Sequence, residues 1–273
     1  MASSLVLLSG VVVAAFICEY VNVTLGMGYG TTLTPLLLIV GFAPLAVIPS
    51  ILLAGFLSGA LAAVMHHRAG NVDFDFRNDS EHQMVKRLGK LGYMPRSKDS
   101  RVALVLGACS LIGAIIAVMV AINIPVFYLK LFIGLLVLTM GIILVCKCKA
   151  SPRFSWGRLV AIGSVAAFNK GISGGGYGPL VTSGQILSGI RSKNSVAISA
   201  FSESLTCLVG VIAYLAIGGG VDWSLSPYLV SGTLISVPLA IYSVKRMPEK
   251  SFTLMIGIAT TVLGVATLYN TLM

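Results

Sequence analysis

Charged side chains are scarce in this chain. Only 10% of its 273 residues are Asp, Glu, Lys or Arg, against about 25% in an average soluble domain, while 56% are hydrophobic. A soluble domain of this length would need a charged surface that 19 basic and 9 acidic residues cannot supply. The composition therefore excludes an ordinary water-soluble domain and predicts a polytopic membrane protein.

Several chemical signatures are also missing. The five cysteines are odd in number and lie mostly in apolar segments, so they do not indicate a disulfide framework. Cys146 and Cys148 are separated by one residue and have no third ligand nearby, which argues against a zinc site. The sequence has no phosphate-binding loop and no nucleophile elbow. We therefore predict no enzyme activity, no catalytic residue, no metal and no cofactor, and the missing ATP-binding motif argues against a primary pump.

Seven apolar segments are long enough to be membrane-spanning helices. Two further apolar stretches, 26–42 and 156–190, are each interrupted by glycines and a proline. The first segment lacks a basic start and a small-residue cleavage site, so we expect a retained helix and not a signal peptide. Crossing the hydrocarbon core takes about 20 apolar residues, and the predicted spans are 4–25, 44–65, 102–123, 126–146, 194–217, 226–244 and 252–272.

The basic residues predict the orientation in the membrane. Eight of them lie between Arg68 and Arg101, four in the segment 147–158 and three in the segment 245–250. The positive-inside rule places these connections in the cytoplasm, so both termini are predicted outside. Topology thus accounts for 15 of the 19 basic residues, and no nucleic-acid partner is expected.

This topology divides the chain into two halves, 1–149 and 150–273. The chain before Pro44 must begin and end outside, so the segments 4–25 and 26–42 together enter and leave on one side, and the broken stretch 156–190 must begin and end inside. Each half then contains one re-entrant hairpin and three full spans, with opposite starting sides. The predicted fold is an all-α membrane protein with two inverted-topology repeats. The polar stretch 67–101 is predicted to be a cytoplasmic loop or small helix, with a regulatory or partner-binding element as the alternative.

An internal duplication falls on the two broken stretches. An offset of 148 residues places Gly26-Met27-Gly28-Tyr29-Gly30 on Gly174-Gly175-Gly176-Tyr177-Gly178 and gives six identities in 16 positions. Close helix packing through small residues is one explanation of these glycines. The other is a nonhelical break, which Pro179 reinforces in the second copy. Backbone N–H groups at such a break, together with the start of the following helix, would form an anion site.

These residues carry a family resemblance that covers essentially the whole chain. The glycine motif in each half, the apolar spans around it, the one long basic loop and the length resemble the sulfite exporter TauE/SafE family, also called the toluene sulfonate uptake permease family. The segment 169–179 is the closer match, and Met27 departs from the small residue common in the first motif. The resemblance implies membrane transport of sulfite, organosulfonates or related small anions, and leaves the substrate and the direction open.

Candidate substrate contacts collect around the two breaks. Lys170 is the strongest, because a fixed cation four residues before the second glycine cluster suits a sulfur oxyanion; a lysine extending to the interface is the alternative. Asn22 is its counterpart at the 148-residue offset and is expected to donate to a substrate oxygen. The other predicted contacts are Asn169, Gly28, Tyr29, Gly30, Thr31, Ser173, Gly175, Gly176, Tyr177 and Gly178, with Thr24, Thr32, Thr182, Ser183 and Gln185 as secondary ones, for whose hydroxyls bonds to helix carbonyls are the alternative.

Two acidic residues, Glu19 and Glu203, fall inside predicted spans. A carboxylate at low dielectric can take up a proton, which makes either a candidate for proton coupling. Neutralisation of Lys170 is the alternative role, and the sequence does not decide between the two.

The leading hypothesis is a multi-pass secondary transporter of the cell membrane that binds a small sulfur-containing anion between its hairpins at the midplane. Alternating access would be driven by the substrate gradient or by a coupled proton or sodium ion. A passive anion channel is the first alternative, and an intramembrane enzyme or assembly subunit is a weaker one. The expected partners are the anionic substrate, the lipid bilayer, the coupled ion and a second copy of the chain in a homodimer.

Overall fold

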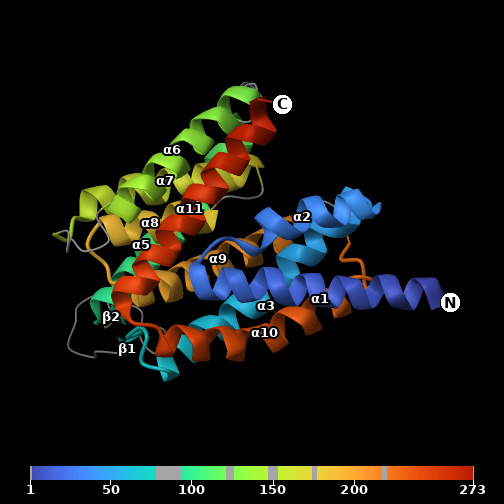
Figure 1. Cartoon of the computed structure of the whole chain (residues 1–273), viewed down its shortest axis with the longest axis horizontal. Helices are drawn as coiled ribbons and strands as arrows, with labels where there is room; N and C mark the ends of the chain where they lie inside the picture. The colour runs from blue at the N-terminus through green and yellow to red at the C-terminus, as the bar shows by residue number, and fades with distance from the viewer. Residues whose placement is uncertain are drawn as a thin grey trace.

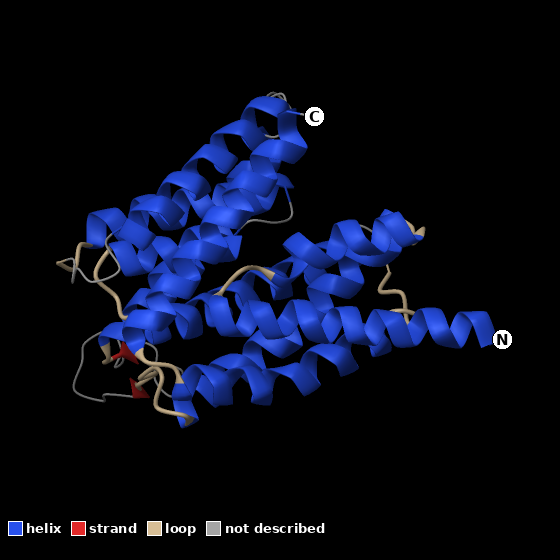
Figure 2. Cartoon of the chain, viewed as in Figure 1, coloured by secondary structure: helices blue, strands red, loops and turns tan. Residues whose placement is uncertain are grey.

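The computed structural model describes residues 2–77, 94–120, 126–146, 153–173, 177–216 and 220–272. These residues are almost entirely helical, as predicted (Figures 1 and 2). The elements in chain order are α1 (Ala2–Leu25), α2 (Tyr29–Val40), α3 (Pro44–Arg68), β1 (Phe76–Arg77), β2 (Met94–Pro95), α5 (Lys98–Val120), α6 (Val126–Cys146), α7 (Trp156–Ser173), α8 (Tyr177–Leu187), α9 (Ser192–Ala216), α10 (Ser226–Arg246) and α11 (Glu249–Leu272).

Every predicted span is a helix in the structure. Within the described residues, five stretches are long and apolar enough to cross a membrane, and they belong to α1, α3, α9, α10 and α11. The predicted span 102–123 corresponds to α5, which ends at Val120, and residues 121–125 lie outside the described part. The chain is therefore a multi-pass membrane protein.

The two broken stretches are helix pairs whose ends repeat at the predicted offset. α1 ends at Leu25 and α7 ends 148 residues later at Ser173. α2 begins at Tyr29, and α8 begins 148 residues later at Tyr177. The segment 26–28 is nonhelical, and its counterpart 174–176 lies outside the described residues. In the first half the glycine-rich sequence thus coincides with the end of one helix and the start of the next.

The same offset extends past the hairpins. α9 begins at Ser192, 148 residues after the start of α3 at Pro44. Gly41 and Gly189, also 148 residues apart, follow α2 and α8 and have φ values of 104° and 91°. The duplication seen in 16 positions of sequence therefore extends through three consecutive helices of each half.

The starts of α5, α9 and α11 meet at one end of the molecule, which we call the basic end because Lys98, Arg191 and Lys250 lie at these starts. Asn194 at the start of α9 donates to Asp99 at the start of α5, and Arg191 faces Glu249 at the start of α11. Both chain termini lie at the ends of α1 and α11 that point away from β1 and β2 (Figure 1). The short antiparallel β1–β2 pair was not predicted, because two-residue strands carry no periodic pattern; residues 78–93 between them lie outside the described part.

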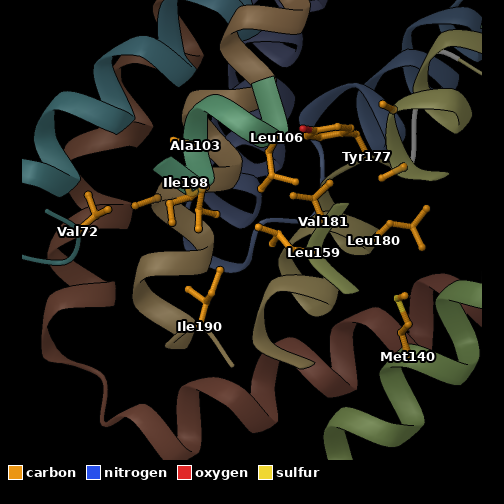
Figure 3. Packing of buried hydrophobic residues seen from close by; sticks show 14 of the residues in the cluster. Val72, Ala103, Leu106, Met140, Leu159, Tyr177, Leu180, Val181, Ile190 and Ile198 are labelled. Carbon is orange, nitrogen blue, oxygen red and sulfur yellow. The ribbon is translucent and has the colours of Figure 1, made fainter. Parts of the chain in front are cut away.

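The helices pack in pairs that join the two halves. α1 lies on α10, α5 on α7, and α3 crosses α9 near the centre. At that crossing a β-carbon on Gly59 would lie 3.0 Å from the carbonyl oxygen of Ala200, so the Gly55-xxx-Gly59 motif serves close packing. The largest apolar cluster joins α5, α6, α7, α8 and α9 (Figure 3). It encloses the start of α8, where Tyr177 is fully buried.

α6 and α11 form an antiparallel pair with four glycines along its contact, which we call the α6–α11 pair. At each of these glycines a β-carbon would lie 3.0 Å or less from an atom of the facing helix, and at Gly264 that atom is the backbone nitrogen of Leu138 at 2.6 Å. A side chain at any of these glycines would collide with the facing helix, so the glycines fix the register of the pair. The four contacts are Gly134 with Leu268, Leu138 with Gly264, Gly141 with Thr261 and Val145 with Gly257.

Candidate functional site

The first glycine break lies against the start of α8. The Oγ1 atom of Thr182 is 3.3 Å from the carbonyl oxygen of Gly26. A β-carbon on Gly178 would collide with that carbonyl and would lie 2.6 Å from the backbone nitrogen of Gly28. The tip of the first hairpin is therefore in direct backbone contact with the first turn of the second hairpin's return helix.

Two positions in the first break require glycine. Gly26 and Gly28 have φ values of 70° and 83°, a conformation that side chains with a β-carbon rarely adopt. A β-carbon on Gly26 would also collide with the hydroxyl of Thr182. Met27, the residue that departs from the family motif, is buried in the cluster that also contains Ile186 of α8.

Asn22 fastens this break to the end of α1. Its backbone carbonyl accepts a hydrogen bond from the N–H of Gly26 at 2.6 Å, and its Oδ1 accepts one from the N–H of Gly28 at 2.7 Å. Its Nδ2 donates to the Oε2 atom of Glu19 at 3.2 Å. In this conformation the amide predicted to contact substrate caps the helix end and orients a buried carboxylate.

A layer of buried polar side chains continues from the break into α9. Thr182 and Ser199 are hydrogen-bonded at 2.9 Å between their hydroxyl oxygens. The Nε2 atom of Gln185 donates to the Ser199 hydroxyl at 2.9 Å and to the carbonyl of Ser195 at 3.3 Å. Gln185 and Thr182 were predicted as secondary contacts, and the structure brings both into one network that ties α8 to α9.

The two tyrosines that open α2 and α8 are both buried. The Tyr177 hydroxyl is 2.6 Å from that of Ser110 on α5. The Tyr29 hydroxyl has no hydrogen-bond partner among the described atoms, although Tyr29 is only 2% exposed. The predicted twin tyrosines therefore have different polar surroundings.

Both predicted membrane carboxylates are buried. Glu19 is fully buried on α1 beside the first break, and Glu203 is 9% exposed on α9, one helical turn beyond Ser199. They lie on helices from different halves. Ser183, a further predicted contact, is 2.9 Å from the Thr260 hydroxyl of α11.

Several predicted contacts lie partly or wholly outside the described part. Gly175 and Gly176 are outside the described residues. Asn169, Lys170 and Ser173 lie in the last turns of α7, leading into the second break, but their side chains are outside the described part, as is that of Thr31. Gly30 lies in the first turn of α2 and Thr32 is exposed on that helix. The cation assigned to Lys170 stays a prediction.

Sequence reasoning missed Ser199 and Ser110. Both lie on long continuous helices, away from any glycine cluster, so the search around the breaks passed over them. A signal was available for α9, where buried polar residues recur at spacings of four, three and four residues along one face. That stripe consists of Ser195, Ser199, Ser202 and Thr206.

Comparison with known proteins agrees with this architecture. The family model described as sulfite exporter TauE/SafE matches residues 88–267. A protein from Bacillus subtilis (strain 168), the probable membrane transporter protein YtnM, is 25% identical to this chain over an alignment of 275 residues. The alignment covers 95% of this chain and 83% of that protein. No solved structure matches the chain. The chain belongs to the sulfite exporter TauE/SafE family.

Proposed function

We propose that the protein is a secondary transporter of small sulfur-containing anions, such as sulfite or organosulfonates, in the cell membrane. The observation that carries the proposal is the contact between the two duplicated hairpins, where the break at 26–28 meets the first turn of α8. The name of the family and that of the Bacillus subtilis relative support transport.

The junction of the hairpins has the chemistry that an oxyanion requires. α2 and α8 both begin there, and the start of a helix carries a partial positive charge and N–H groups without intrahelical partners. Thr182 and Ser199 add hydroxyl groups within the same buried layer. In the proposed site Lys170, at the end of α7, supplies the fixed positive charge that pairs with sulfite or a sulfonate group.

The proposed orientation places the basic connections in the cytoplasm and both termini outside. Residues 1–149 and 150–273 are then inverted repeats, and the substrate site lies between them near the bilayer midplane. Access to that site alternates between the two sides of the membrane. Glu19 and Glu203 are the proposed coupling groups, for a proton or a sodium ion, since each is a carboxylate buried on a helix next to the polar layer.

Uptake of isotopically labelled sulfite into proteoliposomes tests the proposal. Wild-type protein is expected to give saturable uptake that unlabelled organosulfonates inhibit, and Lys170→Gln is expected to abolish it. The matched control is Lys250→Gln, which removes an exposed lysine at the basic end of the molecule. Uptake by Lys170→Gln at the wild-type rate would refute the site, and wild-type protein that moves no sulfur anion would refute the function. Large unitary currents in a planar bilayer would instead identify a channel.

A further inference from the structure

α2 and α8 are equivalent in the duplication but have different surroundings. Every residue of Tyr177–Ile186 in α8 is buried. In contrast, α2 exposes Thr32, the equivalent of Leu180, and it exposes Ile39, the equivalent of Leu187, by 82%. The two helices begin at equivalent positions and have nearly equal lengths, so the difference comes from what packs against them.

The α6–α11 pair covers α8 and leaves α2 open. Met140 of α6 lies in the same apolar cluster as Leu180 of α8 (Figure 3), and Thr260 of α11 is 2.9 Å from Ser183 of α8 through their hydroxyl oxygens. Within the described part of the chain, α2 packs mainly on α1 and α3. The end of α11 that carries the C-terminus stands well apart from α2 (Figure 1).

Within the α6–α11 pair, an approximate two-fold symmetry relates α6 to α11. Gly134 and Gly141 of α6 have counterparts 123 residues later in Gly257 and Gly264 of α11. The same offset relates Val145 to Leu268 and Leu138 to Thr261, so each of the four glycine contacts of the pair maps onto another one. The pair therefore presents related faces in two directions, one of which lies on α8.

We propose that the α6–α11 pair rocks as one body between α8, where it lies in this structure, and the exposed face of α2, and that this motion is the access switch of the transporter. The moving body then takes one helix from each half of the chain, and the other helices form the scaffold. The proposed motion rests on the proposed function in one respect, namely that access to the substrate site alternates between the two sides of the membrane. The glycine seam lets α6 and α11 move together, because separating them would expose closely packed backbone.

Contacts of Glu249 hold the pair in its present position. Its Oε1 accepts a hydrogen bond from the N–H of Ser192 at 2.5 Å, and its Oε2 is 4.0 Å from the guanidinium of Arg191. The Ser192 hydroxyl is also 2.6 Å from that of Thr253. These contacts join the first turns of α11 to the start of α9 at the basic end, so they must break when the pair rocks onto α2.

Engineered cysteine pairs in a variant without native cysteines test the motion. Ser183→Cys with Thr260→Cys is expected to cross-link in the present state. The residue 148 positions before Ser183 is Pro35, and the residue 123 positions before Thr260 is Val137. The pair Pro35→Cys with Val137→Cys is expected to cross-link only in the second state, in which the α6–α11 pair lies on α2. Thr32→Cys with Leu263→Cys, derived in the same way from Leu180 and Met140, is an independent pair in case substitution of Pro35 prevents folding.

The matched control is Ser50→Cys with Ser226→Cys. Their hydroxyl oxygens are 2.8 Å apart, both residues are buried, and they join α3 to α10 within the scaffold. The control cross-link is expected to leave transport unchanged. Cross-links of the α8 pair and of the α2 pairs are each expected to lower transport relative to the same variant after reduction.

The cross-links separate the outcomes. Glu249→Ala, which removes the acceptor of the Ser192 N–H and the partner of Arg191, is expected to raise the ratio of the Pro35–Val137 to the Ser183–Thr260 cross-link by about tenfold, the loss expected for a hydrogen bond to a charged group. Cross-linking of the α8 pair but of neither α2 pair would overturn the proposal. Cross-links at Pro35 or Thr32 that join two chains would assign the α2 face to a second copy and also overturn it. If both states can be cross-linked but the protein transports no sulfur-containing anion, only the proposed substrate is refuted.

Discussion

Replacement of Asn22 by alanine is expected to loosen the first glycine break and weaken transport. The substitution removes the acceptor for the buried N–H of Gly28, which lies 2.7 Å from Oδ1. It also removes the hydrogen bond at 3.2 Å to the fully buried carboxylate of Glu19. An unsatisfied buried N–H costs about 1–3 kcal/mol and a lost bond to a charged group about 1.5–3 kcal/mol, so the free energy of unfolding should fall by roughly 3–5 kcal/mol.

Thermal unfolding in detergent measures this loss, and uptake of labelled sulfite by proteoliposomes measures its functional effect. A melting temperature lower by roughly 10 °C is expected. Asn194→Ala is the matched control, because its amide also donates to a carboxylate, that of Asp99 at 2.5 Å. Water reaches that pair, so the control should lose less than about 1 kcal/mol. Equal melting temperatures and equal transport for the two variants would refute the role assigned to Asn22.

Two further substitutions probe the contact between the hairpins. Gly26→Ala should lower the free energy of unfolding by about 3 kcal/mol or more, because the new methyl group adds a collision with Thr182 to backbone strain. Gly41→Ala, with φ of 104° and nothing within 4 Å of the new β-carbon, should lose only about 1–2 kcal/mol in the same thermal assay, and equal losses would contradict the hairpin contact. Thr182→Val should cost about 2 kcal/mol and reduce uptake, since it leaves Ser199 and Gly26 without their shared hydroxyl. Thr139→Val, which removes an exposed hydroxyl bonded to its own helix, should change stability by less than about 0.5 kcal/mol, and a Thr182 variant that behaves the same way would contradict the polar layer.

The sequence was sufficient to predict the position of the first break. Glycine clusters destabilise a helix wherever they occur, and the end of α1 at Leu25, before the nonhelical segment 26–28, follows directly from them. The apolar length of each span likewise predicted where helices form. These are local effects, so one stretch of sequence contains the information.

The polar layer and the unequal surroundings of α2 and α8 could not be predicted in that way. Ser199 is one serine among many on its helix, and its partners Thr182 and Gln185 approach it only after α8 packs on α9. The exposure of Ile39 depends on which helices pack against α2, and the duplicated sequence does not contain that information. Both features depend on tertiary packing between helices that are distant in the sequence.

The seam of the α6–α11 pair has the form of a subunit interface. In a dimer of identical chains, a residue i that contacts residue j implies that the partner's j contacts i. Gly134 against Leu268 and Val145 against Gly257 obey that rule within one polypeptide, at the offset of 123 residues. One chain therefore contains an isologous contact of the kind normally made by two. A substitution at Gly134 and one at Gly257 should then have matching effects, as the two copies of a single mutation have in a symmetric dimer.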